Sequence, residues 1–340
     1  MAIRRTPALA GAAAAVVTGA AVAAGFYGCS ASEPEPTPQS PSATAPPSPA
    51  TPTTPSRQGI SPFTGLPART APVLAVKIDN VRPARPPTGL EAADIVYVEQ
   101  VEAGLSRILA IYSSRQPPTV GPVRSARESD LELLRQFGRP ALAYSGVQSA
   151  LRPLIDAAPL YPVPPGKAPG AYVRDRDRPA PHNLYLRPER ALAAAPKADK
   201  AADIGFRFGA APPGGREVNE RTVRYPAARF SFTWSDTEKR WLVGMDGTAA
   251  RTSDGQRLGA RTVVVQNVDV TPSAFKDRGG NVTPYTRTVG SGTASVLRDG
   301  RVHDARWSRP AAEGGTSFTT PAGAPLNFAP GQVWIVFAAR

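Results

Sequence analysis

Thiol and imidazole side chains are almost absent from this sequence. It contains one cysteine, Cys29, and two histidines, His182 and His303. Disulfides and zinc–thiolate sites therefore cannot support the fold, and the histidines have no HExxH-type spacing for a transition-metal enzyme. We expect no metal and no other cofactor, although a calcium site built from carboxylates stays open. We also expect His303 to lie exposed on a strand of a hairpin.

Several motifs of catalysis and nucleotide binding are also missing. Ser145 precedes Gly146 but follows Tyr144, so it does not form a G-x-S-x-G nucleophile elbow. The sequence has neither a Walker loop nor a dinucleotide-binding fingerprint. A cysteine nucleophile is impossible if Cys29 carries lipid. These absences disfavour hydrolysis through an acyl-enzyme.

The first residues have the layout of an export signal. Arg4 and Arg5 supply positive charge, residues 8–27 are apolar or small, and Gly28-Cys29 closes the stretch. A lone cysteine after a small residue predicts a bacterial lipoprotein that loses residues 1–28 and is lipidated on Cys29. The alternative is an uncleaved signal anchor, because the stretch approaches the roughly 20 residues that span a bilayer. We expect an extracytoplasmic protein, lipid-anchored to the outer face of the cytoplasmic membrane.

Residues 29–58 are predicted to form a solvated tether. The segment 31–58 contains nine prolines among Ser, Thr, Ala and Glu and has no large apolar residue, so it cannot bury a core. At about 3.1 Å per residue in polyproline geometry, such a tether reaches roughly 80 Å. The folded part would then lie within reach of the cell wall.

The charge is strongly positive. A net charge of +13 becomes +11, with 38 basic and 27 acidic residues, once Arg4 and Arg5 leave with the signal. Such a surface favours anionic partners. Outside the membrane these are phosphate-rich wall polymers, lipid headgroups or carboxylates, and we do not expect nucleic acid. Genome composition is an alternative source of part of the arginine excess.

The residue patterns predict an α+β fold with two domains. A mixed α/β domain would span 59–205 and a β-rich domain 206–340. In the first we expect a helix that starts at a Ser125–Glu128 capping box and stops at Gly138. In the second, Asp299-Gly300 predicts a hairpin. The expected strands are 73–79, 93–102, 105–112, 140–145, 230–234, 239–243, 261–270, 293–297, 301–307 and 332–337, and the other helices are 147–157 and 188–195.

Six short motifs resemble the YerB-like lipoprotein family over about residues 60–340. They are 80–90 (NVRPARPPTGL), 93–97 (ADIVY), 102–107 (EAGLSR), 120–127 (VGPVRSAR), 181–185 (PHNLY) and 331–335 (GQVWI). The resemblance implies two domains on an extracytoplasmic lipoprotein and implies no reaction. Ala103 stands where relatives often carry glycine, which matters if the position needs a positive φ or close ligand approach.

The first functional hypothesis is a wall-facing module that binds an anionic wall polymer or headgroup. Arg124 and Arg127 flank Ser125 at a predicted helix start, where N–H groups and the helix dipole favour an anion. Arginine also recognises phosphate and carboxylate bidentately. In the structural alternative Ser125 caps the helix and the arginines pair with Glu128 or Asp130. The expected cleft is lined by Asn80, Arg85, Arg107, Arg124, Arg127, His182 and Asn183.

Two further hypotheses compete with this one. Asp94 and Glu102 share strand parity, so with the loop residue His182 they are candidates for acid–base hydrolysis of a glycan or phosphodiester. In the structural alternative Asp94 caps a strand and Glu102 pairs with Arg107. The third hypothesis is a scaffold subunit of an envelope complex, which predicts an exposed apolar patch on the β-rich domain.

Overall fold

A computed structural model describes residues 59–277 and 279–340, so the predicted signal, Cys29 and the tether lie outside the described residues. Strands dominate the described part, and helices are few and short. None of the helices in these two ranges is both long and apolar enough to cross a membrane.

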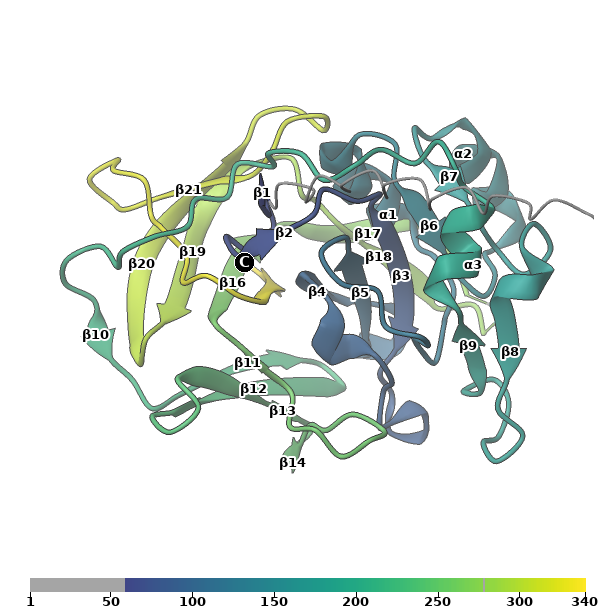
Figure 1. Ribbon diagram of the computed structural model, residues 1–340, viewed down its shortest axis with the longest axis horizontal. Helices are drawn as coiled ribbons and strands as arrows, with labels where there is room; N and C mark the ends of the chain where they lie inside the picture. The colour runs from purple at the N-terminus through teal and green to yellow at the C-terminus, as the bar shows by residue number, and fades with distance from the viewer. Residues whose placement is uncertain (1–58, 278) are drawn as a thin grey trace, which may run out of the picture. The chain divides into compact units, whose positions relative to one another are not determined.

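The largest sheet contains strands from both halves of the chain. From edge to edge it runs β10 (Arg216–Glu217), β20 (Arg301–Arg309), β19 (Gly290–Arg298), β16 (Thr262–Val268), β22 (Val333–Ala339), β4 (Ile95–Gln100), β5 (Ser106–Tyr112), β3 (Leu74–Asp79), β6 (Ala141–Ala143) and β7 (Tyr161–Pro162), and β21 (Ser317–Thr319) pairs with β20. In Figure 1 β20, β19 and β16 lie toward one end of the sheet, and β3 and β6 lie toward the other, with the helices.

The last strand of the chain joins these halves. β22 pairs in parallel with β16 on one side and with β4 on the other. Its residues from Val333 to Phe337 are all buried, which explains why the strand is continuously apolar rather than alternating. Strands from before and after residue 205 therefore belong to one continuous sheet. The division into two domains at this residue stays a prediction.

Smaller sheets and short helices surround this sheet. The second sheet contains β11 (Glu220–Tyr225), β12 (Ala228–Ser235), β13 (Arg240–Met245), β14 (Thr248–Ala249) and β15 (Gly259–Ala260). Three two-stranded sheets are β1–β2 (Gly59–Ile60, Pro67–Ala68), β8–β9 (Tyr172–Arg174, Leu184–Leu186) and β17–β18 (Val270–Lys276, Val282–Thr286). The α-helices are α1 (Glu128–Leu134), α2 (Arg152–Ala157) and α3 (Pro188–Ala193), and short 3-10 turns occur at Arg82–Ala84, Leu90–Ala92, Glu102–Gly104, Arg135–Phe137, Ser149–Leu151 and Pro169–Ala171.

The large sheet is buried on both faces by different layers. On one face, Leu74, Val76 and Ile78 of β3 belong to the same core as Phe230 and Trp241 of the second sheet. On the other face, residues of opposite parity share a core with the apolar side of α1. Because side chains alternate along a strand, neighbouring residues of β3, β4 and β5 enter different cores. The same alternation determines to which face of the sheet each polar side chain at the strand ends points.

Two expectations about local structure need correction. The predicted Ser125–Glu128 capping box is wrong: α1 begins at Glu128, and Asp130 Oδ2 accepts a hydrogen bond from the Arg127 N–H at 2.7 Å. Glu128 instead accepts a hydrogen bond from the Ser273 hydroxyl on β17. A tertiary partner has therefore replaced the local one.

The hairpin prediction is confirmed, but the prediction for His303 is wrong. Asp299 and Gly300 both have positive φ, 50° and 74°, and connect β19 to β20 as a two-residue turn. His303 on β20 is only 6% exposed. Gly215, immediately before β10, lies so close that a Cβ there would be 2.6 Å from the imidazole ring. The pairing of β10 with β20 therefore covers the side chain that the sequence placed on an open face.

Candidate functional site

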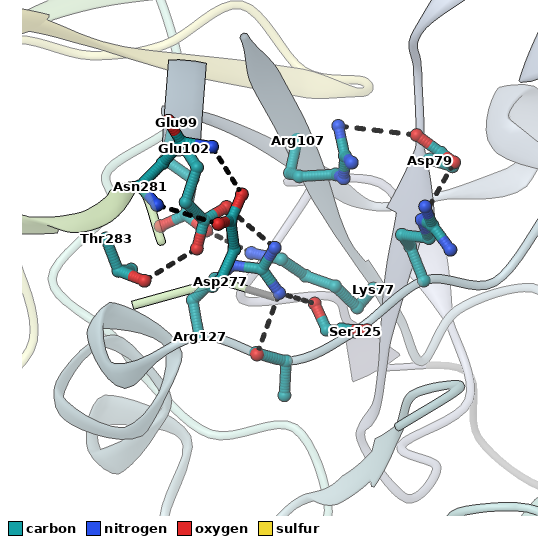
Figure 2. A network of polar contacts seen from close by, with 12 residues as sticks. Lys77, Asp79, Glu99, Glu102, Arg107, Ser125, Arg127, Asp277, Asn281 and Thr283 are labelled. Carbon is teal, nitrogen blue, oxygen red and sulfur yellow. Dashed lines mark hydrogen bonds and ion pairs between the residues drawn. The ribbon is translucent and has the colours of Figure 1, made fainter. Parts of the chain in front are cut away.

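A single buried carboxylate, Asp79, organises the ionic groups at one end of the large sheet. Its Oδ2 lies 2.8 Å from His182 Nδ1 and 3.1 Å from Arg124 Nε, and its Oδ1 lies 3.4 Å from Arg107 Nη1. Figure 2 shows Arg107 reaching Asp79 from the neighbouring strand. Arg124 is positioned because its N–H donates to the Lys77 carbonyl at 2.8 Å. One negative charge is thus shared by two arginines and a histidine.

Arg107 is a buried cation whose hydrogen-bonding capacity is not filled. Arg107 is only 6% exposed, and its Nη1 donates a hydrogen bond to the Ser106 carbonyl at 2.9 Å. Within the described residues its Nε has no acceptor. Burial lowers the pKa of Arg107, Asp79 opposes this shift, and the nearby Arg127 and Arg124 add to it. A further negative group would relieve both the unpaired donor and the crowding of positive charge.

Arg127 is held by a different carboxylate. Its Nη2 and Nε lie 2.7 and 3.1 Å from Glu102 Oε2. Glu102 Oε1 accepts a hydrogen bond from the Thr283 hydroxyl at 2.6 Å. Burial by itself would raise the pKa of Glu102, but the Arg127 and Thr283 hydrogen bonds hold it below its ordinary value. Two structural alternatives are therefore wrong: Glu102 does not pair with Arg107, and the side chains of Arg124 and Arg127 pair with Asp79 and Glu102 and not with Glu128 or Asp130.

A fully buried ion cluster lies beside these pairs. Lys77 Nζ contacts Glu99 Oε1, and it lies 2.7 Å from Asp130 Oδ1 on α1. Burial raises the pKa of Glu99 to about 7, with Lys77 opposing the shift and Asp130 reinforcing it. The sequence reasoning missed this cluster, as it missed Asp79. The signal that could have found them is the charged pair Lys77 and Asp79 inside an otherwise apolar strand.

The arginines face a cavity of about 730 Å³, which we call the arginine cavity and define by Arg107, Arg124, Arg127, Arg152 and Lys276. Glu102, Glu128 and Asp277 also line it, so five cationic side chains meet three carboxylates. No carboxylate in the described part of the chain pairs with Arg152 or Lys276. The chemistry of the wall therefore suits phosphate or carboxylate ligands.

The hairpin β17–β18, which the sequence patterns did not predict, forms one wall of this cavity. Glu128, Glu102 and Glu132 hold it through Ser273, Thr283 and Tyr285, and the Tyr285 hydroxyl donates to Glu132 Oε2 at 2.7 Å. Figure 2 shows Thr283, Asp277 and Asn281 beside Glu102 and Arg127. Segments more than a hundred residues apart thus build one pocket.

The structure divides the predicted ligand-binding residues among several places. Arg107, Arg124 and Arg127 line the arginine cavity, and His182 adjoins it through Asp79. A second cavity is lined by Asn80 and Arg85. Asn183 lines neither of these cavities: its side chain accepts a hydrogen bond from Arg174 and donates to the Asp175 carbonyl.

Asp94 lies away from the other candidate catalytic residues. It precedes β4, whereas Glu102 follows that strand, and the six residues of β4 between them span about 20 Å. Asp94 Oδ2 accepts hydrogen bonds from the Ser113 and Ser114 N–H groups at 2.7 and 2.8 Å. Burial raises the pKa of Asp94 and these hydrogen bonds oppose the shift. The two carboxylates are therefore not brought together at one substrate position.

The turn between β4 and β5 has left-handed backbone geometry. Ala103 has φ 56° and ψ 23°, and Gly104 has φ 69°. Glycine would therefore suit position 103, since only glycine adopts such a conformation without strain. Ala103 also lines the arginine cavity.

Comparisons with known proteins identify relatives of unknown activity. Two family models match, described as the N-terminal and C-terminal domains of a protein of unknown function (DUF3048), over residues 63–202 and 221–335. The sequence is 26% identical to the Bacillus subtilis protein named "Putative lipoprotein YerB", covering 77% of this chain and 80% of that protein. The crystal structure of Bacillus subtilis YerB matches with a TM-score of 0.70 at 21% identity, covering 82% of this chain and 95% of that one. The resemblance to YerB-like proteins is confirmed, and the structural match shows a shared fold.

Proposed function

This chain belongs to the DUF3048 family of proteins of unknown function, and we propose that it is an extracytoplasmic lipoprotein that binds an anionic ligand of the cell envelope in the arginine cavity. The similarity to a YerB protein named as a lipoprotein supports the anchored location, as do the export layout and Cys29. Two acyl chains suffice for stable membrane attachment.

The observation that carries the binding proposal is the sharing of Asp79. Arg107, Arg124 and His182 all contact this one carboxylate, while Arg107 Nε has no partner among the described residues. The two Nη groups of Arg124 are also without a hydrogen-bond acceptor within 59–277 and 279–340, and its side chain is 26% exposed. A phosphate or carboxylate would accept charge-assisted hydrogen bonds here, each contributing about 1.5–3 kcal/mol.

The test measures binding of the purified full chain, in detergent, to isolated cell-wall sacculi that retain or lack their phosphate-containing polymers. The test variant is Arg124→Gln with Arg152→Gln. Arg221→Gln together with Arg187→Gln is the matched control, because both residues are exposed and line neither cavity. We expect at least a tenfold loss of affinity, about 1.4 kcal/mol, in the test variant only. Equal losses in both variants would mean that net charge, not the cavity, drives binding.

The pair formed by Asp79 and His182 favours a second candidate function, hydrolysis of a phosphate or carboxylate ester. A buried carboxylate 2.8 Å from Nδ1 orients the imidazole as in a general base. Asp79 also contacts two arginines and is not dedicated to the imidazole, so binding ranks first. Soluble fragments released from sacculi by the parent chain and lost in His182→Gln would establish hydrolysis instead.

The scaffold hypothesis receives less support. Among the described residues, the large hydrophobic side chains that are exposed are Ile60, Leu66, Leu154, Val173 and Val282. Only Val282 belongs to the β-rich half. These side chains do not form the apolar patch on that half that the hypothesis requires.

A further inference from the structure

A second cavity, of about 860 Å³, lies on the opposite face of the large sheet from the arginine cavity. The strand alternation explains its position: Arg107 and Asp79 point to one face, whereas Ser106 and Asn80 point to the other. We call it the Asn80 cavity. It is lined by Asn80, Val81, Arg82, Pro83, Arg85, Leu105, Ser106, Asp246 and residues 224–229.

The lining of the Asn80 cavity is strongly cationic. Four arginines, Arg82, Arg85, Arg224 and Arg229, face one carboxylate, Asp246. Asp246 is already engaged, because its Oδ2 lies 2.8 Å from Arg85 Nη2 and its Oδ1 accepts the Arg229 N–H at 2.7 Å. Neither Arg82 nor Arg224 forms an ion pair with any other residue of the described ranges. The cavity therefore has an excess of three positive charges for a ligand to neutralise.

Asn80 adds a polar requirement that charge alone does not meet. The residue is 3% exposed, and its Nδ2 donates to Ser106 Oγ at 2.9 Å. Its Oδ1 receives no hydrogen bond from the part of the chain that the structure describes. A buried polar atom without a partner is destabilising, because it has lost its hydrogen bonds to water and gained none in return. A ligand hydroxyl satisfies this amide in either orientation, because a hydroxyl both donates and accepts.

The two cavities meet at the β4–β5 turn, where Leu105 lines both of them. Ser106 and Arg107, which follow Leu105, then line one cavity each. A single chain molecule that passes around this turn would contact both sets of arginines. A small anion would occupy only one set.

We infer that the ligand is a polymer with repeated phosphate groups and free hydroxyls, a polyol phosphate, bound in both cavities at once. This inference rests on the proposed function. The phosphates pair with Arg124 and Arg152 on one face and with Arg82 and Arg224 on the other, and a hydroxyl fills the Asn80 site. Simultaneous occupation raises affinity, because the second contact becomes intramolecular once the first has formed.

The test is isothermal titration of the full chain, in detergent, with three probes: glycerol 1-phosphate, an oligomer of about six glycerol phosphate repeats, and inorganic polyphosphate of similar length. We expect the oligomer to bind at least tenfold more tightly than the monomer. Arg82→Gln with Arg224→Gln should remove that gain, so that the oligomer binds this variant no more tightly than the monomer does. Arg221→Gln with Arg187→Gln, which removes the same charge elsewhere, should retain the gain.

A separate variant tests the hydroxyl requirement. Asn80→Ala should weaken the glycerol phosphate oligomer several-fold and leave polyphosphate, which lacks carbon-bound hydroxyls, unchanged. A thermal melt confirms that each variant is folded. An oligomer that binds no better than the monomer overturns this inference and leaves the proposed function standing. Failure of every probe to bind also overturns this inference, and the proposed function falls with it if the chain fails to bind sacculi as well. An Asn80→Ala variant that weakens both polymers equally, or weakens neither, overturns the role of Asn80.

Discussion

Arg107 Nη1 lies 3.4 Å from Asp79 Oδ1 across two antiparallel strands, yet Asp79 is also the partner of Arg124 and His182. The resulting imbalance, with more positive groups than Asp79 can satisfy, has consequences for stability. Removing the carboxylate leaves a buried guanidinium without compensation, which costs about 3–5 kcal/mol in comparable cases.

We therefore expect Asp79→Asn to lower the free energy of unfolding by about 3 kcal/mol, measured by urea denaturation. Added phosphate should restore stability more in this variant than in the parent chain, because the freed cations then need an anion. Asp156→Asn is the control, since it removes only an exposed partner of Lys167 and should cost under about 0.5 kcal/mol. A similar small effect in both variants would contradict the role given to Asp79.

A substitution in the left-handed turn between β4 and β5 is expected to stabilise the protein, in contrast to Asp79→Asn. Ala103→Gly should raise the unfolding free energy by about 0.5 kcal/mol, because relief of left-handed strain exceeds the entropy that glycine adds to the unfolded chain. Gly104→Ala should be destabilising, since its Cβ would lie 2.5 Å from Pro226 Cβ. Gly146→Ala, where a Cβ would meet nothing within 4 Å, controls for the substitution itself. A loss of stability in Ala103→Gly would contradict this explanation of the turn.

The raised pKa of Glu99 implies that the free energy of unfolding depends on pH. Its pKa in the folded state is about 7, above the ordinary 4.5, so the folded protein holds an extra proton between these values. Stability from this group is therefore greatest at the acidic end of that window and falls as the pH rises toward 7. Urea denaturation at pH 5, 6, 7 and 8 should show this fall, and Glu99→Gln should flatten it. An unchanged slope in the variant would assign the dependence to other groups.

The buried His303 titrates in the opposite sense. Burial lowers its pKa below the ordinary 6.5, and Arg298 and Arg301 reinforce the shift. The folded state resists protonation, so its stabilising contribution is present above pH 6.5 and is lost as the pH falls below it. Proton NMR of the two imidazole rings should show one that titrates below 6.5 and disappears in His303→Gln. A ring at 303 that titrates at or above 6.5 would contradict its burial.

The sequence by itself indicated eight strands of the large sheet, because a continuously apolar run such as β22 reflects burial on both faces. It did not indicate β7, β10 and β21, whose two or three residues are too few to show a pattern. It also specified the Asp299-Gly300 hairpin, since two positive φ values are a local steric requirement. The short motif 120–127 singled out Arg124 and Arg127 as candidate ligand-binding residues. These features depend on residues close together in the chain, which is why a sequence reveals them.

Tertiary structure alone decided which charges meet. Thr283 and Glu102 are 181 residues apart in the sequence but share a hydrogen bond. The two strands that flank β22, β16 and β4, come from opposite halves of the chain. No local pattern determines strand order, so the sharing of Asp79 and the burial of Lys77 with Glu99 were not predictable from one sequence. Strand alternation explains why the side chains of Asp79 and Asn80 point to opposite faces of the sheet. Only the packing of the layers shows that a cavity lies on each face. Short-range sterics and periodicity set the elements, whereas long-range packing set the site.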